Sequence, residues 1–202
     1  MIRDLGVPRL ILASASPRRR ELLGRLGVPF EVLASHIPEE HPAGPPAEAV
    51  AAVALAKALA VLGMLPAAGG PAVVLGADTE VVLDGRLLGK PEDAAAAARM
   101  LRELRGREHQ VVTGVAMVWK GEPAPWPDRE IAAVTSRVRM ADYADEEIAA
   151  YVATGEPLDK AGGYAVQGLG SRLVAAVDGC LTNVIGLPLT TTRALLERRG
   201  LL

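Results

Sequence analysis

Strand-like and helix-like segments alternate along most of this chain, and the dipeptide Asp84-Gly85 interrupts that alternation with a tight turn. Asp-Gly between two apolar runs is a strong signal for a two-residue β-hairpin. Alternating strands and helices favour parallel strand pairs, whereas a hairpin requires an antiparallel pair. We therefore predict an α/β fold in which helices cover a mixed sheet.

The remaining elements follow from periodicity and from turn residues. Strands are expected at 9–14, 29–35, 73–77, 80–83, 86–88, 109–120, 130–140 and 173–177, and helices at 17–26, 47–64, 93–104, from 145 onward and at 188–199. The runs 109–120 and 130–140 should pair as a second hairpin, joined through the loop GEPAPWPD. A glycine-rich stretch at 162–170 precedes the last strand.

Composition limits the classes of partner. The 202 residues are 50% hydrophobic, which favours one globular domain over 1–202. The formal net charge is −2 and aromatic residues make up 3% of the chain, so neither nucleic acid nor an anionic membrane is expected as a partner. The apolar stretch 58–77 is cut by PAAGGP at 66–71, which predicts a helix end, a loop and a buried strand rather than a membrane span. A single cysteine, Cys180, favours a cytoplasmic location.

The segment SASPRRR contains the first candidate site. A predicted strand ends at Ser14, and Ser16-Pro17 then begins a helix. Unpaired N–H groups and the positive end of the helix dipole meet at such a point, which is how proteins bind phosphate. Arg18 and Arg19 would add charged donors to this site. The plainer alternative is a solvated first turn, and it suits Arg20 best.

The segment VVLGADTEVVLDGRLLGKP contains the second candidate site. Asp78 follows a strongly apolar run, where a carboxylate is costly unless it has a partner or a role. Strand ends are also where open α/β sheets bind ligands. If the hairpin folds back, Lys90 faces the same cleft as Asp78. The alternative is that Asp78 caps a turn and that Lys90 is solvated.

Other polar residues stand in apolar or glycine-rich surroundings. Glu39 and Glu40 would supply carboxylates for a divalent cation, Lys57 a cation for a polyphosphate, and Gln167 an amide that reads a base edge. Surface solvation is the alternative for each.

Several catalytic classes lack their motifs here. The histidines are too scattered for a metal triad, namely His36, His41 and His109. No nucleophile elbow or Walker-type loop is present, and Asp78-Thr79-Glu80 lacks the paired aspartates of a phosphoenzyme phosphatase. Water is therefore the expected nucleophile.

Five segments resemble, in order and spacing, the motifs of the Maf family of nucleotide pyrophosphatases over about Leu10 to Pro188. They are LILASASPRRRELL, LALAKALA, GADTEVVLDGRLLGKP, GREHQVVTGVAM and YVATGEPLDKAGGYAVQGLG. The resemblance implies an α/β fold related to the inosine triphosphate pyrophosphatases, with an elongated mixed sheet and a cleft between two lobes. It also implies hydrolysis of a nucleoside triphosphate to the monophosphate and pyrophosphate, with Mg²⁺ or Mn²⁺ as cofactor.

The resemblance gives roles to individual residues. Asp78 matches the family's catalytic aspartate, which accepts a proton from the attacking water, and Glu39 matches an acidic residue near the metal. Both are therefore expected at the metal. The substrate-binding residues are expected to be Ser14, Arg18, Arg19, Lys57, Thr79, Lys90 and Gln167.

Three positions separate the branches of the family. Arg18, Thr79 and Gln167 match the branch that acts on dTTP and UTP, whereas the 7-methyl-GTP branch carries tryptophan, glutamine and glutamate there. In SHIPEE, His36 and Pro38 replace two acids of the common SDIDE. Three alternatives stay open: modified pyrimidine nucleotides as substrates, a 7-methyl-GTP-type activity, and a nucleotide-sensing role linked to septum formation. A homodimer is compatible with the sequence.

Overall fold

The structure, a computed structural model, describes residues 8–66, 69–121 and 129–202. The strands are β1 (Arg9–Leu12), β2 (Glu31–Val32), β3 (Ala72–Leu83), β4 (Arg86–Leu87), β5 (Glu108–Lys120), β6 (Arg129–Met140) and β7 (Val174–Asp178). The α-helices are α1 (Pro17–Gly24), α2 (Pro46–Met64), α3 (Ala94–Leu104), α4 (Asp145–Ala153), α5 (Leu181–Ile185) and α6 (Leu189–Glu197). Short 3-10 helices are η1 (Glu156–Asp159), η2 (Ala161–Gly163) and η3 (Gly168–Leu173).

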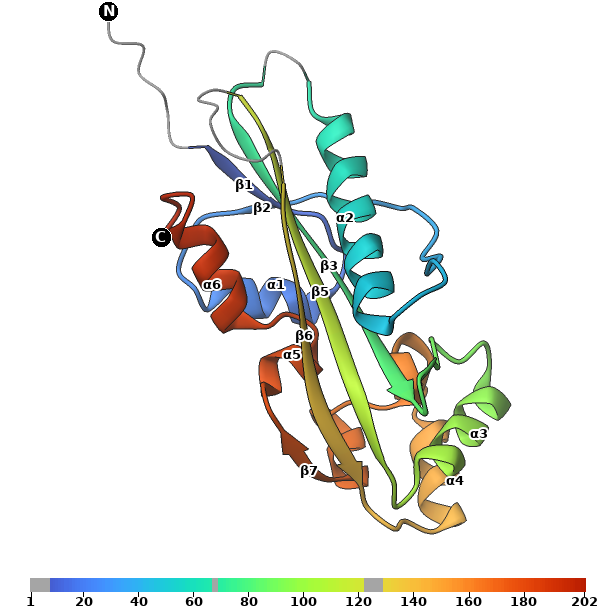
Figure 1. Cartoon of the computed structure of the whole chain (residues 1–202). Helices are drawn as coiled ribbons and strands as arrows, with labels where there is room; N and C mark the ends of the chain where they lie inside the picture. The colour runs from blue at the N-terminus through green and yellow to red at the C-terminus, as the bar shows by residue number, and fades with distance from the viewer. Residues whose placement is uncertain (1–7, 67–68, 122–128) are drawn as a thin grey trace, which may run out of the picture.

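The strands form one mixed sheet in the order β2-β1-β3-β5-β6-β7, with β4 paired to β3. β1 is parallel to both β2 and β3, and the other pairs are antiparallel. The long strands β3, β5 and β6 run the length of the molecule, with helices on both faces (Figure 1). The predicted elongated mixed sheet flanked by helices is confirmed.

Both predicted hairpins form. At the first turn Asp84 and Gly85 have φ angles of 51° and 77°, the positive values that a two-residue hairpin needs. In the second hairpin β5 pairs with β6 from Glu108↔Arg139 to Val118↔Arg129. Most of its predicted loop, residues 122–128, lies outside the described residues.

Two elements differ strongly from the prediction in extent, and one was not predicted. β3 is one continuous strand of 12 residues, so Asp78 lies in its middle rather than at a strand end. The polar positions did not end the strand because they keep their pairing with β5, as in Asp78↔Gly114. The strand expected at 29–35 shrinks to Glu31–Val32. Helix α5 was missed because five residues are too few to show helical periodicity.

One edge of β3 has no strand partner in its middle. β5 pairs with one edge of β3 along almost its whole length, and β1 and β4 pair with the two ends of the opposite edge. The last pair with β1 is Leu12↔Leu75, and the first with β4 is Val82↔Leu87. Among the described strands, none pairs with this edge between those points. Asp78 lies in this unpaired part of the β3 edge, where groups from outside the sheet can contact it.

α2 covers one face of the sheet at very short range. A Cβ at Gly76 would overlap the carbonyl oxygen of Ala54, and a Cβ at Gly114 would lie 2.7 Å from the Cα of Ala51. Glycine on both strands therefore lets the helix lie directly on β3 and β5. α2 is the one described helix long and apolar enough to cross a membrane by length and composition. Its packing on the sheet is that of a core helix.

Two core clusters share the opposite face. The first core cluster joins α1 and α6 to the sheet and contains Leu10, Leu12, Leu22, Leu23, Leu26, Val73, Leu75, Ala77, Val115, Met117, Leu187, Leu195 and Leu196. The second joins α3 and α4 to it and contains Val81, Leu83, Leu101, Leu104, Val111, Val138, Met140, Tyr143, Ile148, Tyr151, Tyr164 and Leu173. These clusters are the cores of the two predicted lobes.

Candidate active site

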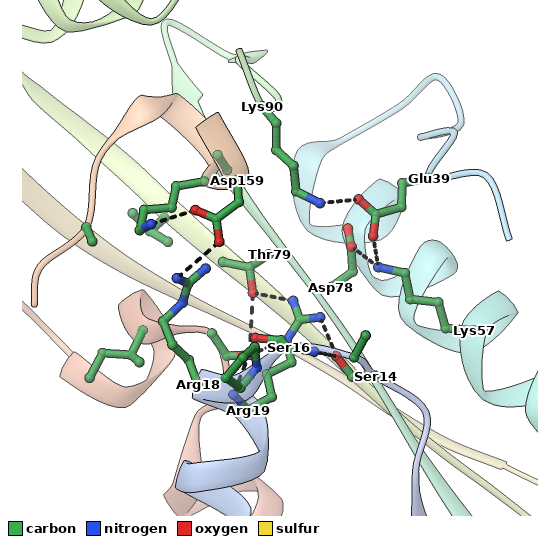
Figure 2. A pocket seen from close by; sticks show the side chains of 18 of the residues that line it. Ser14, Ser16, Arg18, Arg19, Glu39, Lys57, Asp78, Thr79, Lys90 and Asp159 are labelled. Atoms are coloured by element: carbon green, nitrogen blue, oxygen red, sulfur yellow. Dashed lines mark hydrogen bonds and ion pairs between the residues drawn. The ribbon is translucent and has the colours of Figure 1, made fainter. Parts of the chain in front are cut away.

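A cavity of about 420 Å³ lies at the open stretch of β3, between the two lobes (Figure 2). This volume is in the range of small-molecule sites. The structure brings to its lining all of the residues that the family motifs predict for the site, namely Ser14, Arg18, Arg19, Glu39, Lys57, Asp78, Thr79, Lys90 and Gln167. Arg20 and the candidate carboxylate Glu40 are exposed and lie outside this lining.

The start of α1 forms one wall of the cavity. Ser16 is the N-cap, and its hydroxyl accepts a 3.5 Å hydrogen bond from the backbone N–H of Arg19, while Pro17 occupies the first turn. The buried Ser14 hydroxyl accepts from the N–H of Ser16 at 3.2 Å. These contacts fix the turn from β1 into the helix, so the positive end of the helix dipole faces the cavity.

Arg19 is held in one orientation by three hydrogen bonds. Its Nε donates to the carbonyl oxygen of Gly186 at 2.9 Å, its Nη1 to Ser14 Oγ at 3.3 Å, and its Nη2 to Thr79 Oγ1 at 3.0 Å. A guanidinium has five N–H donors, so one on each Nη is left for an anion. Burial lowers the pKa of Arg19, and the Asp78 carboxylate opposes this shift.

Arg18 points across the cavity toward the other lobe. Its Nη1 lies 3.6 Å from Oδ2 of Asp159, and Asp159 also accepts from Lys160 Nζ at 2.6 Å. Asp159 and Lys160 line the cavity and were not predicted as site residues. Both stand in the family motif YVATGEPLDKAGGYAVQGLG, which also contains Gln167, and membership of that motif was the signal that could have identified them.

Lys57 and Glu39 connect the acidic and basic groups of the cavity. Lys57 Nζ donates to Glu39 Oε1 at 2.6 Å and to Asp78 Oδ1 at 2.7 Å, and Lys90 Nζ donates to Glu39 Oε2 at 2.9 Å. Burial alone would raise the pKa of Glu39, but the hydrogen bonds from both lysines outweigh it and hold the pKa at about 2. Glu39 is therefore ionised, with a lysine at each carboxylate oxygen.

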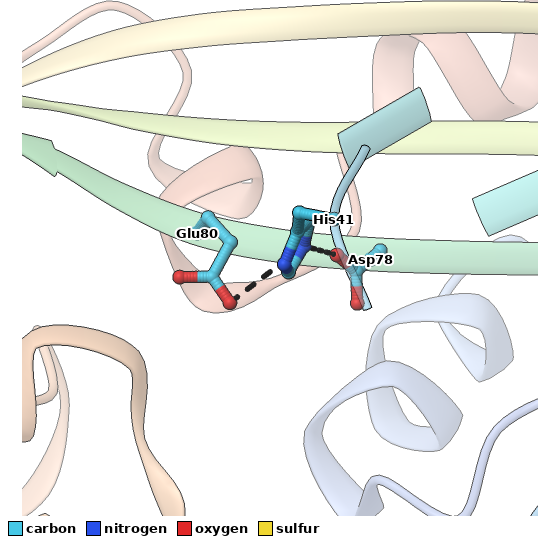
Figure 3. A group of neighbouring side chains, drawn as sticks. All are labelled: His41, Asp78 and Glu80. Carbon is cyan, nitrogen blue, oxygen red and sulfur yellow. Dashed lines mark hydrogen bonds and ion pairs between the residues drawn. The ribbon is translucent and has the colours of Figure 1, made fainter. Parts of the chain in front are cut away.

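His41, Asp78 and Glu80 form a second cluster around the same aspartate (Figure 3). His41 Nε2 lies 2.8 Å from Asp78 Oδ2 and 3.8 Å from Glu80 Oε1, and the three potential ligand atoms lie within 4.8 Å of one another. Burial raises the pKa of Glu80, and the nearby His41 opposes the shift. One imidazole and two carboxylates are a donor set that can hold a divalent cation.

From the sequence the three histidines are too scattered for a metal triad, and no pattern predicts that one of them joins a group of carboxylates. The three histidines do not meet, but His41 joins two carboxylates instead. Glu80 was detectable in the sequence, because residues two apart on a strand share a face. His41 comes from the irregular segment before α2, where no periodicity predicts the direction of a side chain.

Gln167 lies at the start of η3, exposed on the cavity lining. The carboxylate of Glu156 holds the residues that follow it, accepting from the N–H of Leu169 and of Gly170, each at 3.2 Å. Tyr151 Oη in turn donates to Glu156 at 3.1 Å. The predicted base-reading residue therefore sits on a segment that the second lobe anchors.

The mixed sheet, the helix start with its fixed arginine and the buried carboxylate beside a lysine define an α/β protein with a polar cleft in the middle of its sheet. The chain belongs to the Maf family, because the family model described as Maf-like protein matches residues 9–199. It is 52% identical over 193 residues to the dTTP/UTP pyrophosphatase of Moorella thermoacetica, with 95% of each chain covered. It is also 52% identical over 182 residues to the dTTP/UTP pyrophosphatase of Gloeobacter violaceus, with 90% of each covered.

The fold has a counterpart among solved structures. The Ham1 protein of Staphylococcus aureus superposes with a TM-score of 0.50 and 15% sequence identity, over 94% of this chain and 98% of that one. At this identity the likeness concerns the fold alone, and it agrees with the predicted mixed α/β class.

Proposed function

We propose that this protein is a nucleoside triphosphate pyrophosphatase that hydrolyses dTTP and UTP to the monophosphate and pyrophosphate. The observation that carries the proposal is the buried Asp78 carboxylate, which Lys57 and His41 contact from two sides. This carboxylate lines the same cavity as the start of α1. The relatives named dTTP/UTP pyrophosphatase support the choice of substrate.

The cations of the cavity bind the triphosphate in this proposal. Arg19 offers its two remaining N–H donors, and the start of α1 adds backbone N–H groups and the dipole. Lys90, about half exposed, leaves Glu39 to reach a phosphate without unfolding any element. Charge that grows on the leaving pyrophosphate is stabilised by donors already in place.

Asp78 activates the water that attacks the α-phosphorus. Lys57 binds its Oδ1 and His41 its Oδ2, so the carboxylate is held in one orientation on a central strand. The carboxylate takes a proton from the water as the new P–O bond forms and the bond to the leaving pyrophosphate breaks. The products are a nucleoside monophosphate and pyrophosphate.

We propose His41, Asp78 and Glu80 as the residues that hold the divalent cation, because their potential ligand atoms lie within 4.8 Å of one another. His41 would then turn to the cation in place of its contact with Asp78 Oδ2, while Lys57 keeps hold of Oδ1. When bound, Mg²⁺ or Mn²⁺ would supply Lewis-acid polarisation of a phosphoryl oxygen. Electron paramagnetic resonance of added Mn²⁺ should show tight binding that is lost in His41→Ala and Glu80→Gln and retained in Glu39→Gln. If Mn²⁺ binding were lost in Glu39→Gln and in neither of the other variants, Glu39 would be the metal ligand, as the sequence predicts.

Gln167 is proposed to hydrogen-bond the edge of the pyrimidine, because its amide carries both donors and acceptors and lines the cavity. A site built for such bonds rejects the wrong base strongly. Faster hydrolysis of GTP or 7-methyl-GTP than of dTTP and UTP would contradict this assignment.

Pyrophosphate release from a panel of nucleotides, with and without metal, tests the whole proposal. Asp78→Asn should lower kcat by about 10²–10⁴, the usual loss for a general base. Wild-type protein that binds dTTP without turnover would favour the sensing role. A cytoplasmic location and a homodimer are part of the proposal, and fractionation and light scattering test them.

A further inference from the structure

Thr79 and Thr113 face each other across β3 and β5, at the boundary between the two core clusters. They are register partners, and their hydroxyl oxygens lie 3.0 Å apart. Along this face Ala77 of the first core cluster precedes Thr79, and Val81 of the second follows it. Thr113 is fully buried. Most buried hydroxyls are hydrogen-bonded, and that of Thr113 finds a partner in the side chain across from it on the neighbouring strand.

The hydroxyl protons of the pair have a defined direction. Thr113 Oγ1 lies 2.8 Å from the carbonyl oxygen of Asn183, which can only accept. A hydroxyl has a single proton, so Thr113 donates to Asn183 and can only accept from Thr79. Thr79 also lies 3.5 Å from the carbonyl oxygen of Gly186, and its shorter contact is the one with Thr113. Thr79 then presents a lone pair to Nη2 of Arg19 at 3.0 Å. A one-way chain of donors therefore runs from the guanidinium into the core.

The contact between Arg19 and Gly186 also depends on Thr113, through the short helix α5. The carbonyl oxygen of Gly186, which accepts from Arg19 Nε, follows directly after α5. Asn183 ties α5 to the sheet, because its Nδ2 donates to the carbonyl oxygen of Val111 and to Ser136 Oγ, each at 2.9 Å. Thr113 binds the carbonyl of that same Asn183. Loss of the Thr113 hydroxyl would thus loosen two of the three acceptors that hold the guanidinium, Thr79 and Gly186, and leave the third, Ser14.

We propose that Thr113 is a positioning residue that acts through Thr79 to orient Arg19, and that Thr79 serves the phosphate end of the substrate rather than the base. The inference rests on the proposed function in one respect, that the ligand of Arg19 is a polyphosphate. The inference gives Thr79 a physical role. Because threonine at this position matches the branch that acts on dTTP and UTP, a contact with the base would otherwise be expected.

Calorimetric binding of inorganic tripolyphosphate, which has no base, tests the proposal. Thr113→Val keeps the shape of the side chain and should weaken binding roughly tenfold, the loss expected when a bond to a charged group is misplaced. Thr113→Ser keeps the oxygen and should bind within about twofold of the wild type. Thr192→Val is the matched control, because Thr192 is also fully buried and its hydroxyl makes no hydrogen bond within the described structure. Equal affinity in Thr113→Val and Thr192→Val would overturn the proposal.

Two further variants separate a phosphate role from a base role. Thr79→Val should weaken tripolyphosphate binding by the same factor by which it raises KM for dTTP. A raised KM for dTTP with unchanged tripolyphosphate affinity would place Thr79 at the base. In an Arg19→Lys background, which lacks the Nη2 donor, Thr113→Val should have less than about a twofold further effect. A full effect there would show that Thr113 does not act through Arg19.

These outcomes are distinct from failure of the proposed function. Wild-type protein that releases no pyrophosphate from dTTP would overturn the activity, while the tripolyphosphate series would still decide the role of Thr113. Wild-type protein that does not bind tripolyphosphate would overturn the inference whatever happens with dTTP.

Discussion

Lys57 Nζ lies 2.7 Å from Oδ1 of Asp78, and the two side chains are 5% and 4% exposed. Removing two charges from water is expensive, and their mutual attraction offsets that cost only while both are present. The pair forms because Gly76 and Gly114 let α2 lie directly on the strands, which places a lysine of the helix against the middle of β3.

Removal of the lysine should destabilise the protein sharply. Lys57→Met leaves the Asp78 carboxylate buried without its cation, so the free energy of unfolding in urea should fall by about 3–5 kcal/mol. Lys90→Met is the matched control, because Lys90 is half exposed and its ion pair with Glu39 should contribute less than about 1 kcal/mol. Addition of Asp78→Asn to Lys57→Met should restore much of the loss. Equal losses for the two lysines would contradict this account.

Neighbouring arginines should differ in their effect on substrate binding. Arg19 lines the cavity with three fixed hydrogen bonds, whereas Arg20 is exposed outside it. Arg19→Gln should raise KM for dTTP roughly 10- to 100-fold, because bonds to a charged group are lost. Arg20→Gln should leave KM within about twofold. Steady-state kinetics would refute the distinction if both changes raised KM equally.

Stability should fall in acid because of His109. Burial lowers the pKa of this imidazole to about 4, and its Nε2 lies 2.6 Å from the hydroxyl of Tyr164. The unfolded chain binds the proton near pH 6.5 and the folded chain only near pH 4, so stability declines as pH falls between these values. The loss from pH 7 to pH 5 should be about 2 kcal/mol.

His109→Gln removes the titrating group and should have a flatter dependence of unfolding free energy on pH over that range. Chemical denaturation of both proteins at pH 7, 6 and 5 measures the difference. Parallel curves for wild type and variant would assign the acid sensitivity to other groups.

Base discrimination should depend on Glu156, which does not itself line the cavity. Glu156→Ala removes the acceptor for the N–H groups of Leu169 and Gly170 and should loosen the segment that carries Gln167. The preference for dTTP over GTP in kcat/KM should then fall, while tripolyphosphate affinity should not change. Glu147→Ala is the control, since Glu147 accepts from the N–H of Ala144 at the start of α4 and should affect stability alone. Unchanged discrimination in Glu156→Ala would contradict the role of the segment.

Local signals accounted for much of the architecture. Asp84-Gly85 predicted its hairpin because the turn chemistry is contained in two residues. Ser16-Pro17 predicted the start of α1 for the same reason. Alternation predicted β5 and β6, although it placed a break in β3 at Asp78, where pairing with β5 overrides local polarity.

Contacts between segments that are distant in the sequence could not be predicted from local sequence patterns. His41 reaches Asp78 from an irregular segment, and Thr113 gains its role from the carbonyl of Asn183, 70 residues away. No pattern in neighbouring residues encodes such pairs, because they depend on how the helices pack on the sheet.

The sequence by itself determined the mixed α/β class, the hairpins, the turn from β1 into α1 and, through its family motifs, the predicted residues that line the cavity. Only the tertiary structure decided that Asp78 is buried in mid-strand between Lys57 and His41, and that Arg19 is aimed by Thr79 and Gly186. The physical reason is range: turns and periodicity act over a few residues, whereas burial and charge pairing act across the whole packed chain.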